Sequence, residues 1–299
     1  MTLRSMLSGT GVAIITPFNK KNEVDFPSLG KLIDFIIEGG INYIVTLGTT
    51  GETPVLSREE KSDIIHYTLE QVNNRVPVVV GAGGNDTSAL VKELQSLPLK
   101  GAAAVLSASP YYNKPSQEGI FQHYKLVAEA SPMPVILYNV PARTGRNMTA
   151  ATILRMANEI DNIGGIKEAG GDMQQCMEIL RSRPENFLIV SGDDALALPQ
   201  IACGMDGVIS VAANCFPKEF SMMTSACLKG NFASAKKIND SLLDAYHLLF
   251  SENNPAGAKA FLYELGLIEN IVRLPVVPLS GSLQKEVKDF INLLSPVHA

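Results

Sequence analysis

The 299-residue sequence is 46% hydrophobic and 18% charged, a composition that suits one large core or two domains. Its formal net charge of −5, without a basic cluster, argues against nucleic acid or an anionic membrane surface as a partner. Its apolar runs fall short of the roughly 18 residues of a spanning helix. Its four cysteines form no C-x-x-C pair, and its histidines do not group at metal-ligand spacing. We therefore expect a soluble, cytoplasmic protein without a metal site.

Short runs of apolar and β-branched residues recur along the chain. Their hydrophobicity is continuous rather than alternating, which is typical of strands that are buried on both faces in a parallel sheet. We expect eight such strands, at Gly11–Thr16, Ile41–Leu47, Pro77–Gly81, Ala102–Leu106, Pro134–Asn139, Ile163–Lys167, Phe187–Ser191 and Gly207–Val211.

Segments with helical periodicity lie between these runs. Ser57 and Glu60 form a capping-box pattern, in which a hydroxyl and a carboxylate satisfy the amides of the first turn of a helix. Other helices are expected to start at Asp86, Ser116, Thr149, Asp172 and Pro217.

Eight strand–helix units predict an α/β fold of the closed (β/α)8 type, the TIM barrel. A doubly wound open sheet more often has fewer strands and a nucleotide fingerprint after the first one, and no such fingerprint follows here. After Gly230 the strand pattern stops and helical periodicity continues through Leu294, interrupted near Pro275 and Pro278. We predict a catalytic barrel over residues 1–229 and a small C-terminal helical domain over residues 230–299.

One expected strand delivers a lysine, Lys167, into a glycine-rich turn. A lysine at the end of an apolar strand either reaches the surface, pairs with a carboxylate such as Glu168, or is desolvated so that its amine attacks a carbonyl. An ordinary lysine has about one free amine in a thousand near neutral pH, so the third interpretation needs a pocket that disfavours the ammonium ion. The residues around Lys167 must decide between these interpretations.

In a (β/α)8 barrel the residues that follow the strands converge at one mouth. Each of them has an ordinary explanation alone, such as a turn hydroxyl or a surface cation. Together they supply a nucleophile, proton carriers and a carboxylate clamp, as a Schiff-base enzyme for a 2-oxo acid requires. They are Thr49 and Thr50, Tyr111 and Tyr112, Tyr138, Arg143, Lys167, the Ser191–Asp194 turn, and Ile209 with Ser210.

Six motifs stand in one order along the chain: GTTGE, SPYYNKP, YNVPARTG, GIKEAGG, SGDD and GVISV. They resemble those of the pyruvate-dependent class I aldolase family, which contains dihydrodipicolinate synthase and N-acetylneuraminate lyase. The resemblance covers the chain from about Gly9 to the C-terminal helices. Several motifs in register make it more specific than any one motif alone.

The resemblance implies a catalytic role for four residues. Lys167 would form an imine with pyruvate, and the imine would become an enamine nucleophile. Tyr138 would be the acid–base group, and Thr49 and Tyr112 would complete a proton relay with it. In this family the relay tyrosine, which matches Tyr112 or its neighbour Tyr111, reaches across a subunit interface.

The resemblance also implies how the substrate is held. Thr50 would bind the pyruvate carboxylate, and Gly192 and Ile209 would contribute backbone carbonyls that shape the site. No metal or organic cofactor is expected, because the lysine itself supplies the electrophilic activation. The family commonly forms tetramers built as dimers of dimers, so a homotetramer is expected.

Arg143 is the position that selects a substrate within the family. In dihydrodipicolinate synthases the matching arginine binds the carboxylate of L-aspartate-4-semialdehyde, and a guanidinium suits a planar carboxylate. We therefore expect condensation of pyruvate with that aldehyde, on the diaminopimelate route to lysine. The alternatives are a lyase for N-acetylneuraminate or another 2-oxo sugar acid, a non-catalytic 2-oxo-acid sensor, and a pyridoxal-phosphate enzyme.

Regulation is expected to depart from that of relatives inhibited by lysine. Asn85 and Tyr111 match the inhibitor pocket of regulated members. Arg58 and Lys61 stand where some strongly regulated members have histidines, and Ala89 stands where they have a glutamate. Two cations and a missing carboxylate suit an ammonium ligand poorly, so we expect weak or absent inhibition.

Overall fold

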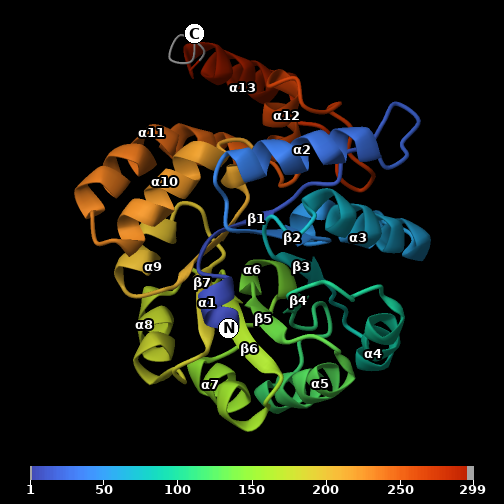
Figure 1. Ribbon diagram of the computed structural model, residues 1–299, viewed down its shortest axis with the longest axis vertical. Coiled ribbons are helices and arrows are strands. Elements are labelled where there is room, and N and C mark those ends of the chain that lie inside the picture. The colour runs from blue at the N-terminus through green and yellow to red at the C-terminus, as the bar shows by residue number, and fades with distance from the viewer. Residues whose placement is uncertain (1, 295–299) are drawn as a thin grey trace.

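Eight parallel strands close into a barrel in which each strand pairs with its neighbours in the sequence and β1 pairs with β8 (Figure 1). The computed structural model describes residues 2–294, so the first residue and the last five fall outside the described part. The strands are β1 (Gly9–Ala13), β2 (Tyr43–Thr46), β3 (Val78–Gly81), β4 (Ala104–Ala108), β5 (Val135–Asn139), β6 (Ile163–Glu168), β7 (Leu188–Ser191) and β8 (Gly207–Ser210).

All eight predicted strands are confirmed, although their bounds differ from the predicted ones, and both ends shift by two or more residues in β1 and β4. The first was predicted over Gly11–Thr16, but pairing starts at Gly9, which lies opposite Gly207 of β8. The fourth was predicted from Ala102, but the Ala102 N–H bonds the Leu99 carbonyl in a turn, so the strand starts two residues later. Hydrophobicity alone does not distinguish such a turn from a strand.

Helices surround the barrel and follow the strands in alternation (Figure 1). The longer ones are α2 (Phe26–Glu38), α3 (Arg58–Val72), α4 (Thr87–Ser96), α5 (Gln117–Ala130), α7 (Ala150–Glu159), α8 (Met173–Ser182) and α10 (Pro217–Leu228). Two shorter ones are α6 (Pro141–Thr144) and α9 (Ala197–Ala202).

The predicted helix starts are confirmed by their caps. Ser57 and Glu60 form both bonds of the capping box at the start of α3. The other predicted caps accept backbone N–H bonds with their side chains, and Pro217 is the first residue of α10. Each such bond satisfies an amide that the helix itself leaves free.

The barrel has two buried layers. Alternate strand residues such as Val80, Leu137 and Ile189 pack outward against the helices. The others form a smaller cluster that fills the interior, with Val190 and Ile209 among them. Burial on both faces explains why the strands read as continuous apolar runs.

A short N-terminal helix, α1 (Leu3–Met6), lies at the start of β6, the end of the barrel opposite the expected site (Figure 1). Arg4 donates to Asp206, with Nε 2.9 Å from Oδ1, and Arg183 bonds the other oxygen at 2.7 Å. Asp206 also accepts from the backbone N–H of Ile189. The sequence did not predict α1, because four residues are too few to show a helical period.

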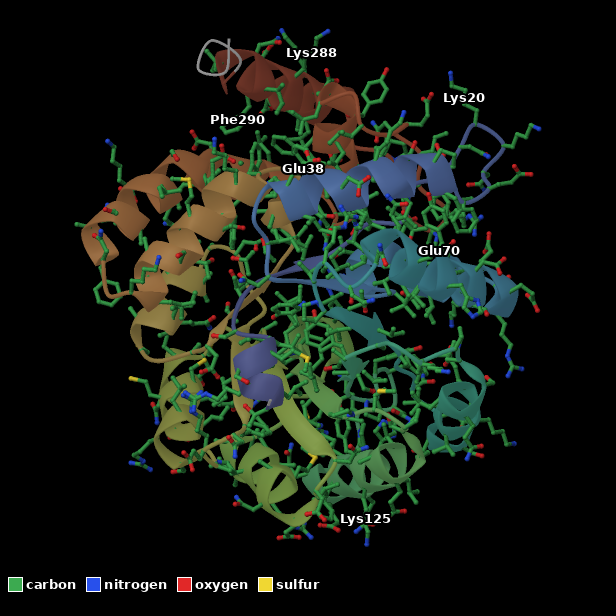
Figure 2. The ribbon with its side chains drawn as sticks, viewed as in Figure 1. Lys20, Glu38, Glu70, Lys125, Lys288 and Phe290 are labelled. Atoms are coloured by element: carbon green, nitrogen blue, oxygen red, sulfur yellow. The ribbon has the colours of Figure 1, made fainter. Side chains whose placement is uncertain are left out.

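Three helices follow the barrel: α11 (Phe232–Phe250), α12 (Ala256–Glu264) and α13 (Gly281–Leu294). Pro275 and Pro278 lie between α12 and α13, as expected. Figure 2 shows Phe290 on the side of α13 that faces the rest of the protein, and its ring packs on Phe216 and Phe261 at 6.1 and 5.9 Å between centroids. None of the helices within residues 2–294 is long and apolar enough to cross a membrane.

The expected boundary between residues 229 and 230 falls in the turn between α10 and α11. These two helices pack against each other, so the turn joins two helices in contact rather than two separate domains. The division of the chain into two domains stays a prediction.

Candidate active site

Lys167 and Tyr138 lie side by side at the C-terminal ends of β6 and β5. They are paired in register, and the lysine Nζ is 4.4 Å from the centre of the tyrosine ring. The two residues are 5% and 8% exposed. A nearly buried amine beside a phenol at the carboxyl end of a barrel is the arrangement that a Schiff-base site requires.

Glu168 does not serve as the partner of this lysine. The next residue of a strand points to the opposite face, and the Glu168 carboxylate accepts bonds from Asn139 at 2.9 and 3.0 Å and from Gln175 at 3.2 Å. Its Oε1 also accepts the Gly170 N–H at 2.6 Å. Burial raises the pKa of Glu168, and these donors oppose that effect. The interpretation in which Lys167 pairs with Glu168 is therefore wrong.

Gly192 leaves room for the stem of Lys167. A Cβ atom built on Gly192 would be 2.9 Å from the lysine Cε and 2.6 Å from the Ala169 Cβ, both too close for any side chain. The Gly192 N–H also donates to the Glu168 carbonyl at 2.7 Å, which holds this turn beside β6. Glycine is therefore needed here for close approach of the backbone.

The two threonines that follow β2 lie in a single 3-10 turn, Thr49–Gly51. Thr50 is 2% exposed, and its Oγ1 accepts a bond of 3.1 Å from Asn254 Nδ2. Thr49 is half-buried. The Gly51 carbonyl accepts the Thr16 hydroxyl at 2.8 Å, which ties the turn to the segment after β1.

Arg143 is exposed on α6, in the segment that follows β5. Asn139 holds this segment from the strand end: its Nδ2 donates to Asn147 at 2.7 Å and its Oδ1 accepts the Met148 N–H at 3.0 Å. The guanidinium is thus carried on a braced turn at the same end of the barrel as Tyr138.

Tyr111 and Tyr112 lie on the loop after β4 and are 43% and 88% exposed. Tyr112 has a backbone φ of 71°, in the left-handed region that residues other than glycine seldom adopt. A phenol this exposed does not enter the barrel of its own chain, so the structure does not bring Tyr112 to Tyr138.

The turns after β7 and β8 are joined by a buried carboxylate. Asp194 accepts the backbone N–H groups of Val211 and Ala212 at 3.1 and 2.8 Å. Burial raises the pKa of Asp194 to about 6. Ile209 is 1% exposed on β8. Within residues 2–294 no group of three or more His, Cys, Asp or Glu residues is placed to hold a metal ion.

Sequence reasoning missed the C-terminal residues that contact this end of the barrel. Lys259 is 0% exposed, and its Nζ lies 2.6 Å from Glu52 Oε1 in the residue that follows the threonine turn. The sequence did contain a sign that Lys259 is unusual, because it is a single cation in the run of small residues from Ala256 to Ala260. Asn254 left no such signal, because an asparagine before a proline reads as an ordinary turn.

Comparison with known proteins gives a consistent result. The model of the Dihydrodipicolinate synthetase family matches residues 6–294. The 4-hydroxy-tetrahydrodipicolinate synthase of Parabacteroides distasonis is 47% identical over 289 residues, with 97% of each chain covered. That of Phocaeicola vulgatus is 48% identical over 292 residues, with 98% of each covered.

The fold agrees as well. The crystal structure of dihydrodipicolinate synthase from Thermotoga maritima superposes with a TM-score of 0.94 at 37% identity, covering 97% of this chain and 99% of that one. A barrel with a buried lysine and tyrosine at its mouth, matched over nearly its whole length at such identity, leaves one assignment: the chain belongs to the dihydrodipicolinate synthetase family.

Proposed function

We propose that the chain is a 4-hydroxy-tetrahydrodipicolinate synthase that joins pyruvate to L-aspartate-4-semialdehyde in the cytoplasm, on the diaminopimelate route to lysine. The observation that carries this proposal is the buried Lys167 amine 4.4 Å from the Tyr138 ring at the barrel mouth. The relatives at 47–48% identity carry the same name, which supports the choice of aldehyde.

The reaction begins at the Lys167 amine. Its lone pair attacks C2 of pyruvate, and loss of water gives an imine. Removal of a proton from the methyl carbon gives the enamine, whose carbon attacks the aldehyde carbon and forms the new C–C bond. The aldehyde oxygen takes up a proton at this step, and the Tyr138 phenol, whose ring lies beside the Lys167 amine, would supply it.

Proton transfer through Tyr138 needs partners. A phenol with a pKa near 10 moves protons poorly at neutral pH unless hydroxyl groups beside it pass them on. We propose that Thr49 and Tyr112 serve this purpose, and that Tyr112 comes from a second copy of the chain. Its 88% exposure and its left-handed backbone support this, because both are costs that a partner subunit would offset.

A site that uses Tyr112 of a second chain requires at least a dimer. We propose a homotetramer built from two such dimers. Tyr111, 43% exposed beside it, would pack at the same interface. A tyrosine pair projecting from one loop suits such an interface, since aromatic residues are enriched in interface cores.

Pyruvate is proposed to bind through the turn after β2. The Thr50 hydroxyl and backbone N–H would hold its carboxylate, and the carbonyls of Gly192 and Ile209 would line the opposite side. Arg143 would hold the carboxylate of the aldehyde with two parallel hydrogen bonds, because a guanidinium matches a carboxylate in geometry. Its exposure leaves it free to do so.

One experiment tests the proposed chemistry. The protein is incubated with pyruvate and borohydride, and the modified peptide is mapped by mass spectrometry, while turnover of aspartate semialdehyde is followed in parallel. We expect a pyruvyl adduct on Lys167 together with turnover, and neither in Lys167→Ala. An adduct without turnover would overturn the aldehyde assignment, and no adduct would overturn the mechanism.

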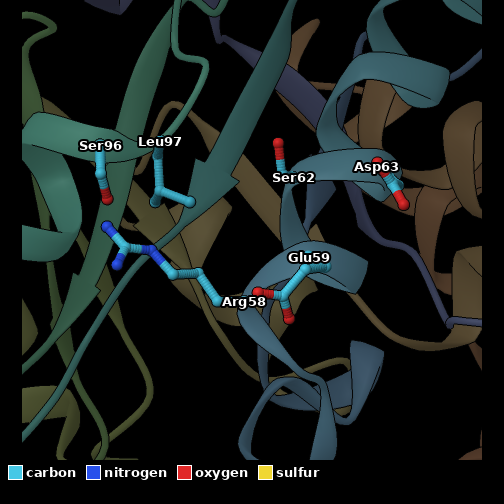
Figure 3. Close-up of a pocket in the computed structure, with 6 residues that line it drawn as sticks. All are labelled: Arg58, Glu59, Ser62, Asp63, Ser96 and Leu97. Atoms are coloured by element: carbon cyan, nitrogen blue, oxygen red, sulfur yellow. The ribbon is translucent and has the colours of Figure 1, made fainter.

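We also propose that lysine inhibits this enzyme weakly or not at all. Lys61 is already paired with Glu93 at 2.8 Å, so it places a fixed cation on α3. Arg58 lines a pocket of about 300 Å³ between α3 and α4, and its guanidinium points toward Ser96 (Figure 3). Ala89 offers no carboxylate to a bound ammonium. A low-micromolar inhibition constant for lysine would contradict this proposal.

A further inference from the structure

Two contacts join the threonine turn after β2 to the segment that leads into α12. Asn254 Nδ2 donates to Thr50 Oγ1 at 3.1 Å, across 204 positions of sequence. Lys259 Nζ lies 2.6 Å from Glu52 Oε1. The C-terminal region thus holds both the proposed carboxylate-binding residue and the residue two positions after it.

All four side chains in these contacts are buried. Thr50 and Glu52 are 2% and 4% exposed, and Asn254 and Lys259 are 7% and 0% exposed. A buried ammonium is tolerated only when its donors are satisfied, and Lys259 also donates to the Ile271 carbonyl at 2.8 Å. Burial lowers the pKa of Lys259 to about 8, against the raising effect of Glu52. The lysine therefore remains a cation at neutral pH.

The ion pair fixes an unusual backbone. Glu52 has φ 54° and ψ 32°, in the left-handed region, and is not a glycine. Such a conformation persists when surrounding contacts determine it. Here both oxygens of Glu52 are held, one by Lys259 and the other by the Arg273 N–H at 2.9 Å. These contacts come from the C-terminal region, so this region sets the shape of the turn.

The Asn254 bond has a chemical consequence for Thr50. A hydroxyl has one proton to donate and two lone pairs that accept. The Asn254 N–H occupies a lone pair, which leaves the hydroxyl proton free for another partner. A carboxylate accepts and does not donate, so the hydroxyl must present that proton to pyruvate.

We propose that Asn254 is a positioning residue for pyruvate: its amide orients the Thr50 hydroxyl as a donor to the pyruvate carboxylate, and the Lys259–Glu52 ion pair keeps the two segments together. This inference rests on the proposed function, in which Thr50 binds that carboxylate.

The deciding substitution is Asn254→Asp, which keeps the size of the side chain and replaces a donor with an acceptor. The Thr50 hydroxyl then donates its hydrogen bond to the new carboxylate. As a result, a lone pair of the hydroxyl and the negative charge of the carboxylate face pyruvate. Asn254→Ala removes the donor without adding charge. We expect KM for pyruvate to rise about 10-fold or more in Asn254→Asp, as for a lost hydrogen bond to a charged group, and less in Asn254→Ala. The kcat at saturating pyruvate changes little.

Asn162→Asp is the matched control. Asn162 donates to backbone carbonyls of residues 128, 131 and 133 at the opposite end of the barrel, so this change also loses hydrogen bonds of a partly buried amide. We expect it to lower stability and to leave KM for pyruvate unchanged. If Asn254→Asp instead lowers kcat and stability without raising KM for pyruvate, Asn254 has a merely structural role and the inference is overturned.

Thr50→Val supplies the coupling test and covers the case in which Asn254→Asp does not fold. Without the hydroxyl, Asn254 has nothing to orient, so Asn254→Ala should add little to the KM of Thr50→Val. Additive effects would overturn the inference. Borohydride trapping of wild type distinguishes failure of the proposed function from failure of this inference. If no pyruvyl adduct forms, the proposed function is overturned and the inference with it. If the adduct forms normally but the Asn254 variants depend on pyruvate as wild type does, only the inference is overturned.

Discussion

Lys167 and Tyr138 occupy paired positions on adjacent strands, with the amine 4.4 Å from the centre of the phenol ring. Their separation is set by the hydrogen bonds between β5 and β6 rather than by flexible loops. One residue further along, Asn139 and Glu168 are again paired and bond each other through their side chains on the outer face. The sheet therefore holds the Lys167 amine and the Tyr138 phenol, the two groups proposed to react, at a fixed distance.

Replacing Tyr138 with phenylalanine keeps the ring beside Lys167 and removes the O–H group. We expect kcat to fall by about 10²–10⁴, the usual contribution of a positioned acid–base group, while borohydride still traps pyruvate on Lys167. Steady-state kinetics and intact mass spectrometry check both parts.

Tyr124→Phe is the control for this variant. The Tyr124 hydroxyl donates to the Ser107 carbonyl at 2.7 Å inside the protein. Its removal should cost about 1 kcal/mol of stability and leave kcat unchanged. A Tyr138→Phe enzyme as active as Tyr124→Phe would contradict the role of Tyr138.

Replacing Arg143 with alanine removes the proposed clamp for the aldehyde carboxylate. We expect KM for aspartate semialdehyde to rise by about 10–100-fold, as for a lost hydrogen bond to a charged group, with trapping of pyruvate unchanged. Arg146→Ala, in the same segment, is the comparison, because Arg146 NH2 bonds the Lys114 carbonyl. Equal KM values for the two variants would exclude Arg143 as the clamp.

Mixing two inactive variants tests whether Tyr112 acts in a neighbouring subunit. Lys167→Ala lacks the proposed nucleophile, and Tyr112→Phe lacks the proposed relay phenol. If each site combines Lys167 of one subunit with Tyr112 of another, random re-association of the dimers should restore activity to about a quarter of wild type. Activity that stays at the level of the separate variants after the subunits have exchanged would show that Tyr112 does not act in a neighbouring subunit.

Asp194 predicts a pH dependence of stability. Its pKa is raised from 3.8 to about 6 by burial, so the folded state favours the protonated carboxyl. The stability that this proton contributes is fully present below about pH 4 and is lost as the pH rises through 6. Relative to Asp194→Asn, wild type should therefore lose about 2 kcal/mol between pH 4 and pH 6, because the slope reaches its full value of about 1.4 kcal/mol per pH unit only between the two pKa values. Urea unfolding of both proteins across this range measures the difference, and parallel curves would refute it.

Asp206 should matter for stability and not for chemistry, because it lies at the end of the barrel away from Lys167. Its carboxylate joins Arg4, Arg183 and the Ile189 N–H. Asp206→Ala leaves two cations without this partner, so we expect a loss of about 3 kcal/mol in the free energy of unfolding. Denaturant titration measures that loss, and kcat well below the melting temperature should equal that of wild type.

The repeated strands of the fold could be predicted from the sequence, and so could the presence of polar residues at the strand ends. Continuous apolar runs predicted the eight strands because each strand is buried on both faces. Lys167 could be singled out because a lysine ending such a run is conspicuous. The bounds of β1 and β4 were less accurate, because turn hydrogen bonds such as that of Ala102 leave no trace in hydrophobicity.

The contacts between distant segments could not be predicted. Thr50 gives no sign that its partner is Asn254, because side-chain hydrogen bonds across 204 positions depend on the finished fold. The Glu52–Lys259 pair was hidden for the same reason, although Lys259 was visible as a single cation in a run of small residues. The role proposed for Tyr112 involves another copy of the chain, which no pattern within one sequence describes.

The distance in sequence between Thr50 and Asn254 also means that their contact forms late during synthesis of the chain. Chains emerge from the ribosome N-terminus first, and their early parts begin to fold before the rest is made. By the time β8 ends at Ser210 every barrel strand exists, yet Glu52 still lacks its cation and Thr50 its amide donor. A nascent barrel therefore lacks the two contacts that are proposed to orient Thr50, and these contacts form only after the segment through Lys259 has left the ribosome.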